Sequence, residues 1–183
     1  HKGADVVCPI NSTMAVSIVA NEAGSKVIHT KVGSVEVSRE MVKRKSIIGL
    51  EENGGFMYGK LNEVRDGVMT TALVLDMMAT ENQTLSTLMS SLPKIFQYKA
   101  KFRCNKQKAN EVVQSCLKHG SFQNVETLDG AKIWIDKETW VMVRPSGTEP
   151  LVRMYAESTD EMLLNSKVRE YRRLIEGTIN CAL

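Results

Sequence analysis

Short apolar runs alternate with helix-like segments along the first half of the chain. Brief strands rich in β-branched residues are predicted at residues 5–8, 26–30 and 47–50. The first intervening helix is capped by Ser12 or Thr13 and ends near Ala23. The second is capped by Ser34 and ends near Lys45. Strands that alternate with helices in this way indicate a parallel sheet with helices on its faces.

Two more helices are predicted before the pattern changes. The longer begins after the cap residue Asp66 and extends to about Ala79, and a short amphipathic helix spans residues 84–92. The methionines of the longer helix, Met77 and Met78, are interpreted as core packing rather than as a binding stripe. Residues 93–98 are predicted to form a linker, because the alternation of strand and helix stops there.

The second half of the chain is predicted to be richer in β-structure. Strands are expected at residues 99–104, 125–128, 131–135, 140–143 and 151–156. Short turns between the middle strands indicate antiparallel hairpins. Helices are expected at residues 106–117 and, after a capping box at 158–161, up to about Gly177.

These elements predict two domains. Residues 1–92 should form an α/β three-layer domain with a mixed or parallel sheet. Residues 99–183 should form a smaller α+β domain with an antiparallel sheet packed by helices. Ligands of parallel α/β sheets bind beyond the carboxyl ends of the strands. Lys31 and the loop at residues 51–55 are expected at that edge.

Composition narrows the classes of function. The 183 residues include 43% hydrophobic and 25% charged residues, with a net charge of +3 and both signs interspersed, which is ordinary for a soluble domain. We expect no nucleic-acid partner and no membrane association, because there is no basic cluster and no apolar stretch of roughly 18 residues. The four cysteines form no C-x-x-C pair, and the three histidines are scattered, so we expect no metal site and a cytoplasmic setting.

The segment VRPSGTEPLV, residues 143–152, has the properties of a phosphate-binding loop. A strand leads to Arg144, whose guanidinium can donate two parallel hydrogen bonds to phosphate oxygens. Ser146 and Thr148 provide hydroxyl groups, and Gly147 permits close approach or a positive φ. The backbone amides of these three residues can converge on an anion. The alternative is a polar turn between strands in which Arg144 pairs with a carboxylate.

The segment GLEENGG, residues 49–55, suits a ligand with neighbouring hydroxyl groups. Glu51 can accept two hydrogen bonds from a sugar, and Asn53 can both donate and accept. Lys31, in TKVGS, can meet a phosphate or a sugar oxygen. The alternatives are a charged surface turn for the loop and a solvated side chain for Lys31.

These segments together resemble the α-D-phosphohexomutases. RPSGTEPLVRMYAE resembles the phosphate-binding loop of the family's fourth domain, and GLEENGG resembles the sugar-binding loop of its third. Three other segments also resemble the family. The lysine–glycine loop resembles TKVG, a helix start resembles RDGVMTTALVL, and the passage between the two domains resembles LPKIFQY. The chain departs from the family pattern at three positions: Leu50 replaces a usual glycine, and Ser34 and Gly55 replace histidines of some bacterial members. EENGG is similar to the archaeal-type branch.

The resemblance implies the C-terminal half, domains three and four, of an isomerase that interconverts hexose 6-phosphate and hexose 1-phosphate. The family uses a phosphoserine in domain one, a Mg²⁺ loop in domain two and a bisphosphorylated sugar. Neither the serine nor the metal loop is found in this sequence, so we expect no bound Mg²⁺ and no activity without those two N-terminal domains. Arg144, Ser146, Gly147 and Thr148 are then expected to hold the distal phosphate of a hexose phosphate.

Under the same resemblance, Glu51, Asn53 and Lys31 are expected to contact the sugar. The family includes phosphomannomutases, phosphoglucomutases and phosphoglucosamine mutases, and the sequence does not distinguish their hexoses. Two other possibilities remain open at this point. The chain could be a sugar-phosphate binding module without a catalytic partner, or an oligomerisation or regulatory protein that has kept the fold and lost the ligand.

Overall fold

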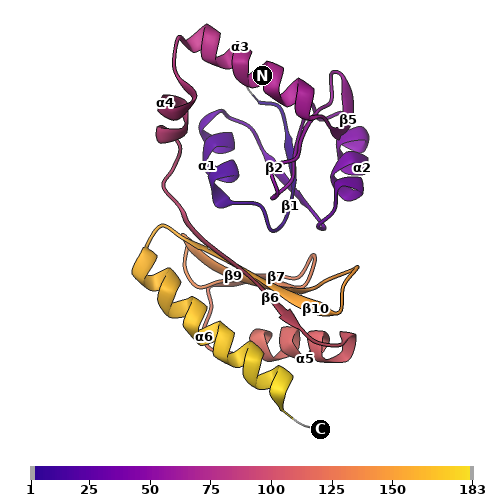
Figure 1. Ribbon diagram of the computed structural model, residues 1–183, viewed down its shortest axis with the longest axis vertical. Helices are drawn as coiled ribbons and strands as arrows, with labels where there is room; N and C mark the ends of the chain where they lie inside the picture. The colour runs from indigo at the N-terminus through magenta and orange to yellow at the C-terminus, as the bar shows by residue number, and fades with distance from the viewer. Residues whose placement is uncertain (1–2, 182–183) are drawn as a thin grey trace. The chain divides into compact units, whose positions relative to one another are not determined.

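The computed structural model describes residues 3–181 and divides into two compact units, His1–Pro93 and Lys94–Leu183, each built around its own sheet (Figure 1). The first sheet has the strand order β2-β1-β3-β4-β5, and the second has the order β6-β10-β9-β8-β7. The predicted fold class is confirmed: a mixed sheet with parallel strands comes first, and an antiparallel sheet follows.

The first sheet has a parallel core and an antiparallel edge. Its strands are β1 (Val6–Pro9), β2 (Val27–Thr30), β3 (Ile48–Leu50), β4 (Phe56–Tyr58) and β5 (Asn62–Arg65). The central strand β1 pairs in parallel with β2 and β3, whereas β3, β4 and β5 pair antiparallel. Strands β4 and β5 were not predicted from the sequence. They have three and four residues, too few for an alternating pattern to be recognised without knowledge of the partner strand.

Helices α1 (Met14–Glu22) and α2 (Ser34–Arg44) lie on opposite sides of this sheet in Figure 1. Thr13 is the N-cap of α1, and its hydroxyl oxygen accepts a hydrogen bond from the amide of Ala15. The cap predicted for α2 is wrong by one residue. Gly33 is the N-cap, with φ 141°, and Ser34 is the first helical residue. Glycine supplies a backbone conformation there that a serine would adopt only under strain.

Helix α3 (Gly67–Glu81) begins at the predicted cap, since the Asp66 carboxylate accepts a hydrogen bond from the amide of Met69. A short helix, α4 (Leu85–Ser90), follows. The interpretation of the α3 methionines as core is wrong, because none of the described residues of α3 is buried and Met77 is 42% exposed. The helix is apolar around most of its circumference, so its sequence does not indicate which side should be covered.

The second sheet consists of antiparallel strands. They are β6 (Phe96–Arg103), β7 (Asn124–Glu126), β8 (Ala131–Trp134), β9 (Thr139–Pro145) and β10 (Leu151–Ser158). Strand β6 begins at Phe96, inside the stretch predicted to be a linker. Phe96 and Tyr98 alternate with more exposed residues and pack against the core, which is the pattern of a strand with one covered face.

Helices α5 (Lys106–Leu117) and α6 (Glu161–Asn180) pack on one face of this sheet (Figure 1). The core between them includes Val112, Val141, Met154 and Tyr171. The predicted capping box is shifted by two residues: Asp160 is the N-cap of α6 and accepts hydrogen bonds from the first helical turn. Ser158, the expected cap, instead ends β10 and is fully buried.

Candidate functional site

The antiparallel connections of the second sheet bring two loops to one end. The loop of residues 146–150 joins β9 to β10, and the turn at Asp129 and Gly130 joins β7 to β8. The hairpin between β8 and β9 lies at the opposite end. Because β8 pairs with β9, the 129–130 turn is next to the strand that leads into the 146–150 loop. Arg144 therefore stands where these two loops meet.

Arg144 is paired with a carboxylate. Its Nε and Nη2 both lie 3.1 Å from Oδ2 of Asp129. Both side chains are largely buried, with 12% of Arg144 and 18% of Asp129 exposed. A guanidinium has five N–H donors, and this contact occupies only the Nε–Nη2 edge. The ion pair foreseen as the alternative to phosphate binding is therefore present, and the remaining donors on Nη1 and Nη2 are compatible with a second acceptor.

The 146–150 loop is closed by its own hydrogen bonds. The amide of Ser146 donates to the carbonyl oxygen of Leu151 at 2.9 Å, so it does not contribute to an anion nest as the sequence suggested. The hydroxyl oxygen of Ser146 accepts a hydrogen bond from the amide of Glu149 at 3.3 Å, which leaves its own hydrogen free to donate elsewhere. No protein acceptor is recorded for the amides of Gly147 and Thr148 among the described residues.

Gly147 lies in open space. It does not have a positive φ, and a Cβ placed on it would meet no atom within 4 Å. The fold itself therefore does not require glycine at this position, contrary to one reason given for it from the sequence. The absence of a side chain leaves room directly beside the amides of residues 147 and 148.

Two further cations lie on the same face of the sheet as Arg144, and sequence reasoning did not single them out. Arg153 on β10 is directly opposite Arg144 on β9, and Lys101 on β6 is directly opposite Arg153. Residues opposite each other in an antiparallel pair project from the same face. Arg153 pairs with Glu149 of the loop. This row of three cations, Arg144, Arg153 and Lys101, could be recognised only once the strand register was known.

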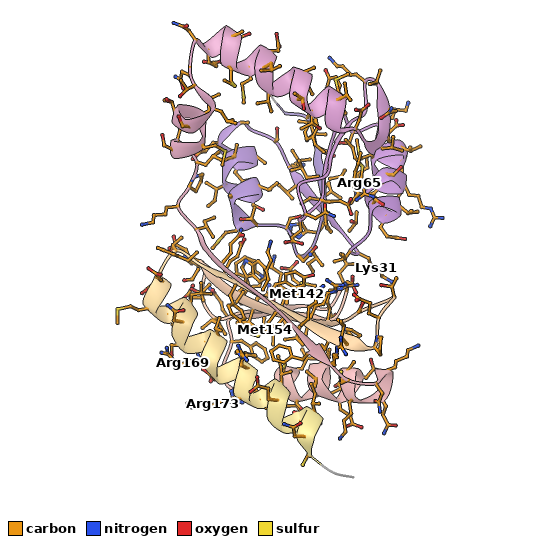
Figure 2. The ribbon with its side chains drawn as sticks, viewed as in Figure 1. Lys31, Arg65, Met142, Met154, Arg169 and Arg173 are labelled. Carbon is orange, nitrogen blue, oxygen red and sulfur yellow. The ribbon has the colours of Figure 1, made fainter. Side chains whose placement is uncertain are left out.

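In the first unit, the predicted residues follow parallel strands. Lys31 comes directly after β2, and Glu51 comes directly after β3. Both strands run parallel to β1, so all three end at one edge of the sheet. No partner is recorded for the ammonium group of Lys31 among the described residues. Figure 2 shows Lys31 and Arg65, which provide positive charges in this unit.

The 51–55 loop is a tight, internally bonded turn. The amide of Glu51 donates to the carbonyl oxygen of Gly55 at 2.7 Å, and Gly54 has a φ of 89°. The side-chain oxygen of Asn53 accepts a hydrogen bond from the amide of Gly55 at 3.2 Å. This contact fixes the orientation of the Asn53 amide and leaves its NH₂ group for other acceptors.

The carboxylate of Glu51 is shielded from solvent and is not fully satisfied. Its Oε2 lies 3.1 Å from Nε of Arg65, which makes an ion pair, yet that oxygen has no hydrogen bond of good geometry. The ion pair balances the charge of Glu51, and the missing alignment leaves Oε2 able to accept a further hydrogen bond. Only 10% of the Glu51 side chain is exposed, so an additional donor would be a favourable partner.

Two polar residues at the same sheet edge were missed from the sequence. Asn11 and Ser12 follow the central strand β1, and both are nearly fully buried. Oδ1 of Asn11 and Oγ of Ser12 have no hydrogen-bond partner in the structure. Ser12 was interpreted only as a possible helix cap. Its place after the central strand was the available signal, because the loop after β1 lies between those of β2 and β3.

The part of the chain that the structure describes contains no group of three or more histidine, cysteine, aspartate or glutamate residues that could hold a metal ion. Among the same residues, no helix has the length and apolar character needed to cross a bilayer. The four cysteines are free thiols, and burial raises the pKa of Cys116 to about 12, which makes this thiol unreactive at neutral pH.

Comparison with known families assigns both units. Residues 1–96 match the phosphoglucomutase/phosphomannomutase alpha/beta/alpha domain III, and residues 100–173 match the phosphoglucomutase/phosphomannomutase C-terminal domain. The chain belongs to the phosphoglucomutase/phosphomannomutase family. The resemblance found in the sequence motifs is thereby confirmed.

Individual relatives of the family are longer than this chain. A phosphoglucosamine/phosphogalactosamine mutase of Sulfurisphaera tokodaii is 37% identical over 175 residues, which are 94% of this chain and 38% of that protein. A phosphoglucomutase/phosphomannomutase family protein from Burkholderia thailandensis matches with a TM-score of 0.82 at 20% identity, over 99% of this chain and 39% of that chain. The chain thus spans about two fifths of the length of these proteins.

A third match comes from a solved complex. An Aspergillus fumigatus N-acetylphosphoglucosamine mutase in complex with GlcNAc-6P and magnesium has a TM-score of 0.64 at 12% identity, over 96% of this chain and 39% of that chain. At identities of 20% and 12%, the two solved structures establish the fold alone. Membership of the family and the mutase class of its relatives rest on the family models and on the S. tokodaii enzyme.

Proposed function

We propose that this chain is the substrate-recognition part of a phosphohexomutase, which interconverts hexose 6-phosphate and hexose 1-phosphate. The observation that supports this most directly is the loop at residues 144–148. Arg144 retains unoccupied guanidinium donors there, and the adjacent amides of Gly147 and Thr148 have no recorded protein acceptor. A phosphate dianion offers only acceptors, so it complements this set of donors.

The loop would hold the phosphate that does not react in a given half of the cycle. Arg144 would fix the orientation of the phosphate through Nη1 and Nη2, while the Ser146 hydroxyl, the amide of Gly147 and the amide of Thr148 would donate to the remaining oxygens. Binding energy from a remote phosphate offsets the loss of freedom when the reacting end of the sugar is aligned. The contribution of this loop is therefore to position the substrate.

The first unit would bind the sugar. Glu51 would accept hydrogen bonds from hydroxyl groups through its unsatisfied Oε2, and the NH₂ of Asn53 would donate to another oxygen. Lys31 would provide a positive charge at the same sheet edge. These contacts do not depend on which end of the sugar is phosphorylated. They would therefore serve a substrate that binds in two orientations.

The phosphoryl-transfer groups would belong to the rest of the protein. The described residues lack a cluster suited to a metal ion, so they do not fit a Mg²⁺ site, and we assign no step through a metal to this chain. We expect this chain alone to be inactive as a mutase. Its free cysteines suit the reducing cytoplasm proposed from composition.

A second substrate class is supported by one specific observation. The S. tokodaii relative acts on amino-sugar phosphates according to its name, whereas the family models are named for glucose and mannose phosphates. Hexosamine phosphates are therefore the alternative substrates. A comparison of kcat/KM for glucose, mannose and glucosamine phosphates with the complete enzyme would decide between these two classes.

Titration of this chain with inorganic phosphate tests the proposal. Binding should be weak, with a Kd of about 1 mM, because the sugar contacts and the remaining domains do not contribute. In amide NMR spectra, the signals of Gly147 and Thr148 should move most. The signal of Ser146 should move less, since its amide is already bonded to Leu151. Shifts elsewhere, with these two signals unchanged, would show that the phosphate site is not this loop.

Substitution of Asn53 by aspartate tests the sugar site. Aspartate keeps the oxygen that accepts from Gly55 but loses the NH₂ donor, so the turn should persist while a sugar contact is lost. In the complete mutase, we expect KM to rise about three- to thirtyfold with a smaller change in kcat. Asn62→Asp is a matched control, because the side-chain oxygen of Asn62 accepts from the amide of Val64 within strand β5 of the same sheet. Equal effects of the two substitutions would contradict the assignment.

A further inference from the structure

We propose that Asp129 is a positioning residue for the phosphate loop, which holds the guanidinium of Arg144 in the orientation that phosphate requires. This inference rests on the proposed function of the loop. It adds a residue outside the 144–148 segment, fifteen positions earlier in the chain and in a different turn. Within the sequence, Asp129-Gly130 was interpreted only as a hairpin turn.

The contact geometry distinguishes positioning from simple charge balance. Both Nε and Nη2 of Arg144 lie at the same distance, 3.1 Å, from one carboxylate oxygen of Asp129. The hydrogen bond from Nε and the ion-pair contact of Nη2 to this one oxygen hold the Nε–Nη2 edge toward Asp129. The opposite edge, formed by Nη1 and the second hydrogen of Nη2, then presents two donors in a fixed relation.

Gly130 explains how the carboxylate of Asp129 comes so near to Arg144. This residue has a φ of 83°, and a Cβ on it would lie 2.4 Å from the carbonyl oxygen of Val143 and 2.6 Å from Cβ of Arg144. The turn is therefore pressed against the backbone of β9 at Arg144 itself. This close contact places the neighbouring residue, Asp129, beside the guanidinium of Arg144. A larger residue at position 130 would move Asp129 away from Arg144.

Burial strengthens the pairing. Because most of both side chains is shielded from solvent, screening by water is weaker than at an exposed ion pair. A long arginine side chain that is already fixed loses less conformational freedom when phosphate binds. An opposing effect exists, since a carboxylate near an anion site also repels the anion. Positioning and repulsion predict opposite changes in affinity when the charge of Asp129 is removed.

The experiment is a phosphate titration of this chain, followed through the Gly147 and Thr148 amides, for the wild type and two variants. Asp129→Asn removes the charge and one strong acceptor, and phosphate affinity should fall about three- to tenfold. Asp136→Asn is the matched control. Asp136 accepts from the amide of Glu138 in the hairpin at the opposite end of the same sheet, so affinity should stay at the wild-type level.

Melting temperatures and the NMR signal of the Arg144 Nε–H separate positioning from general stability. In Asp129→Asn, the Nε–H signal of Arg144 should differ from that of the wild type even in the absence of phosphate. The melting temperature should remain close to that of Asp136→Asn. If Asp129→Asn unfolds, Asp129→Glu keeps the charge but displaces the carboxylate, and affinity should again fall. Affinity that is unchanged or higher in the folded variant would overturn the inference. A wild-type loop that binds no phosphate would instead overturn the proposed function.

Discussion

Replacing Arg144 with alanine in the complete mutase should lower kcat/KM for hexose phosphates by about one to three orders of magnitude, or about 1.4–4 kcal/mol of transition-state stabilisation. The substitution removes the only guanidinium in the loop and leaves the largely buried carboxylate of Asp129 without this partner. A carboxylate that Arg144 no longer balances would add repulsion toward the incoming phosphate.

Two companion variants divide this effect into its parts. The double variant Arg144→Ala with Asp129→Ala removes the repulsion as well, so it should recover part of the loss. Arg144→Lys should be intermediate, since lysine is a point charge that cannot donate from two edges at once. Arg172→Ala is the control. Arg172 on α6 donates to Tyr98 of β6 and pairs with Glu176, and Tyr98 packs on the helix-covered face of the sheet, so kcat/KM should stay nearly unchanged. A reduction below threefold in Arg144→Ala would argue against a phosphate contact.

Local signals in the sequence identified the helix start at Asp66 and narrowed the first one to Ser12 or Thr13, of which Thr13 is the cap. In both cases a side-chain oxygen accepts from an amide of the first turn, and this chemistry involves only neighbouring residues. The start of α2 differed because Gly33 takes the cap position through its backbone conformation. Serine is a common N-cap residue, so position 34 was predicted to be the cap. Only the φ of Gly33 shows that Ser34 lies inside the helix.

Features that depend on partners could not be predicted. The exposure of α3 is one example, since a helix that is apolar around most of its circumference has no clear pattern to indicate its partner. The candidate site gives two more. Arg144 was found from its own segment, but its contact with Asp129 follows from the pairing of β8 with β9. The unpaired oxygen of Asn11 likewise depends on β1 being the central strand of its sheet.

Gly130 links the fold of the second unit to its candidate site. We expect Gly130→Ala to destabilise this unit by about 2–5 kcal/mol. About 1–2 kcal/mol comes from placing a non-glycine residue at positive φ, and about 1–3 kcal/mol comes from overpacking against the β9 backbone. The nearest atoms belong to backbone and to Cβ, so a side-chain rotation cannot relieve the contact. Urea unfolding of this chain, followed by signals of the second unit, measures the change.

Gly120→Ala separates the two contributions. Gly120 also has a positive φ, 72°, but a Cβ there would meet nothing within 4 Å, so only the conformational part of about 1–2 kcal/mol should be lost. The difference between the two variants isolates the close approach of the 129–130 turn to Arg144. If that approach also sets the position of Asp129, Gly130→Ala should weaken phosphate binding under conditions where the protein remains folded, whereas Gly120→Ala should not. Equal stability losses in the two variants would show that the turn can move away from β9 freely, which is incompatible with a fixed carboxylate beside the guanidinium.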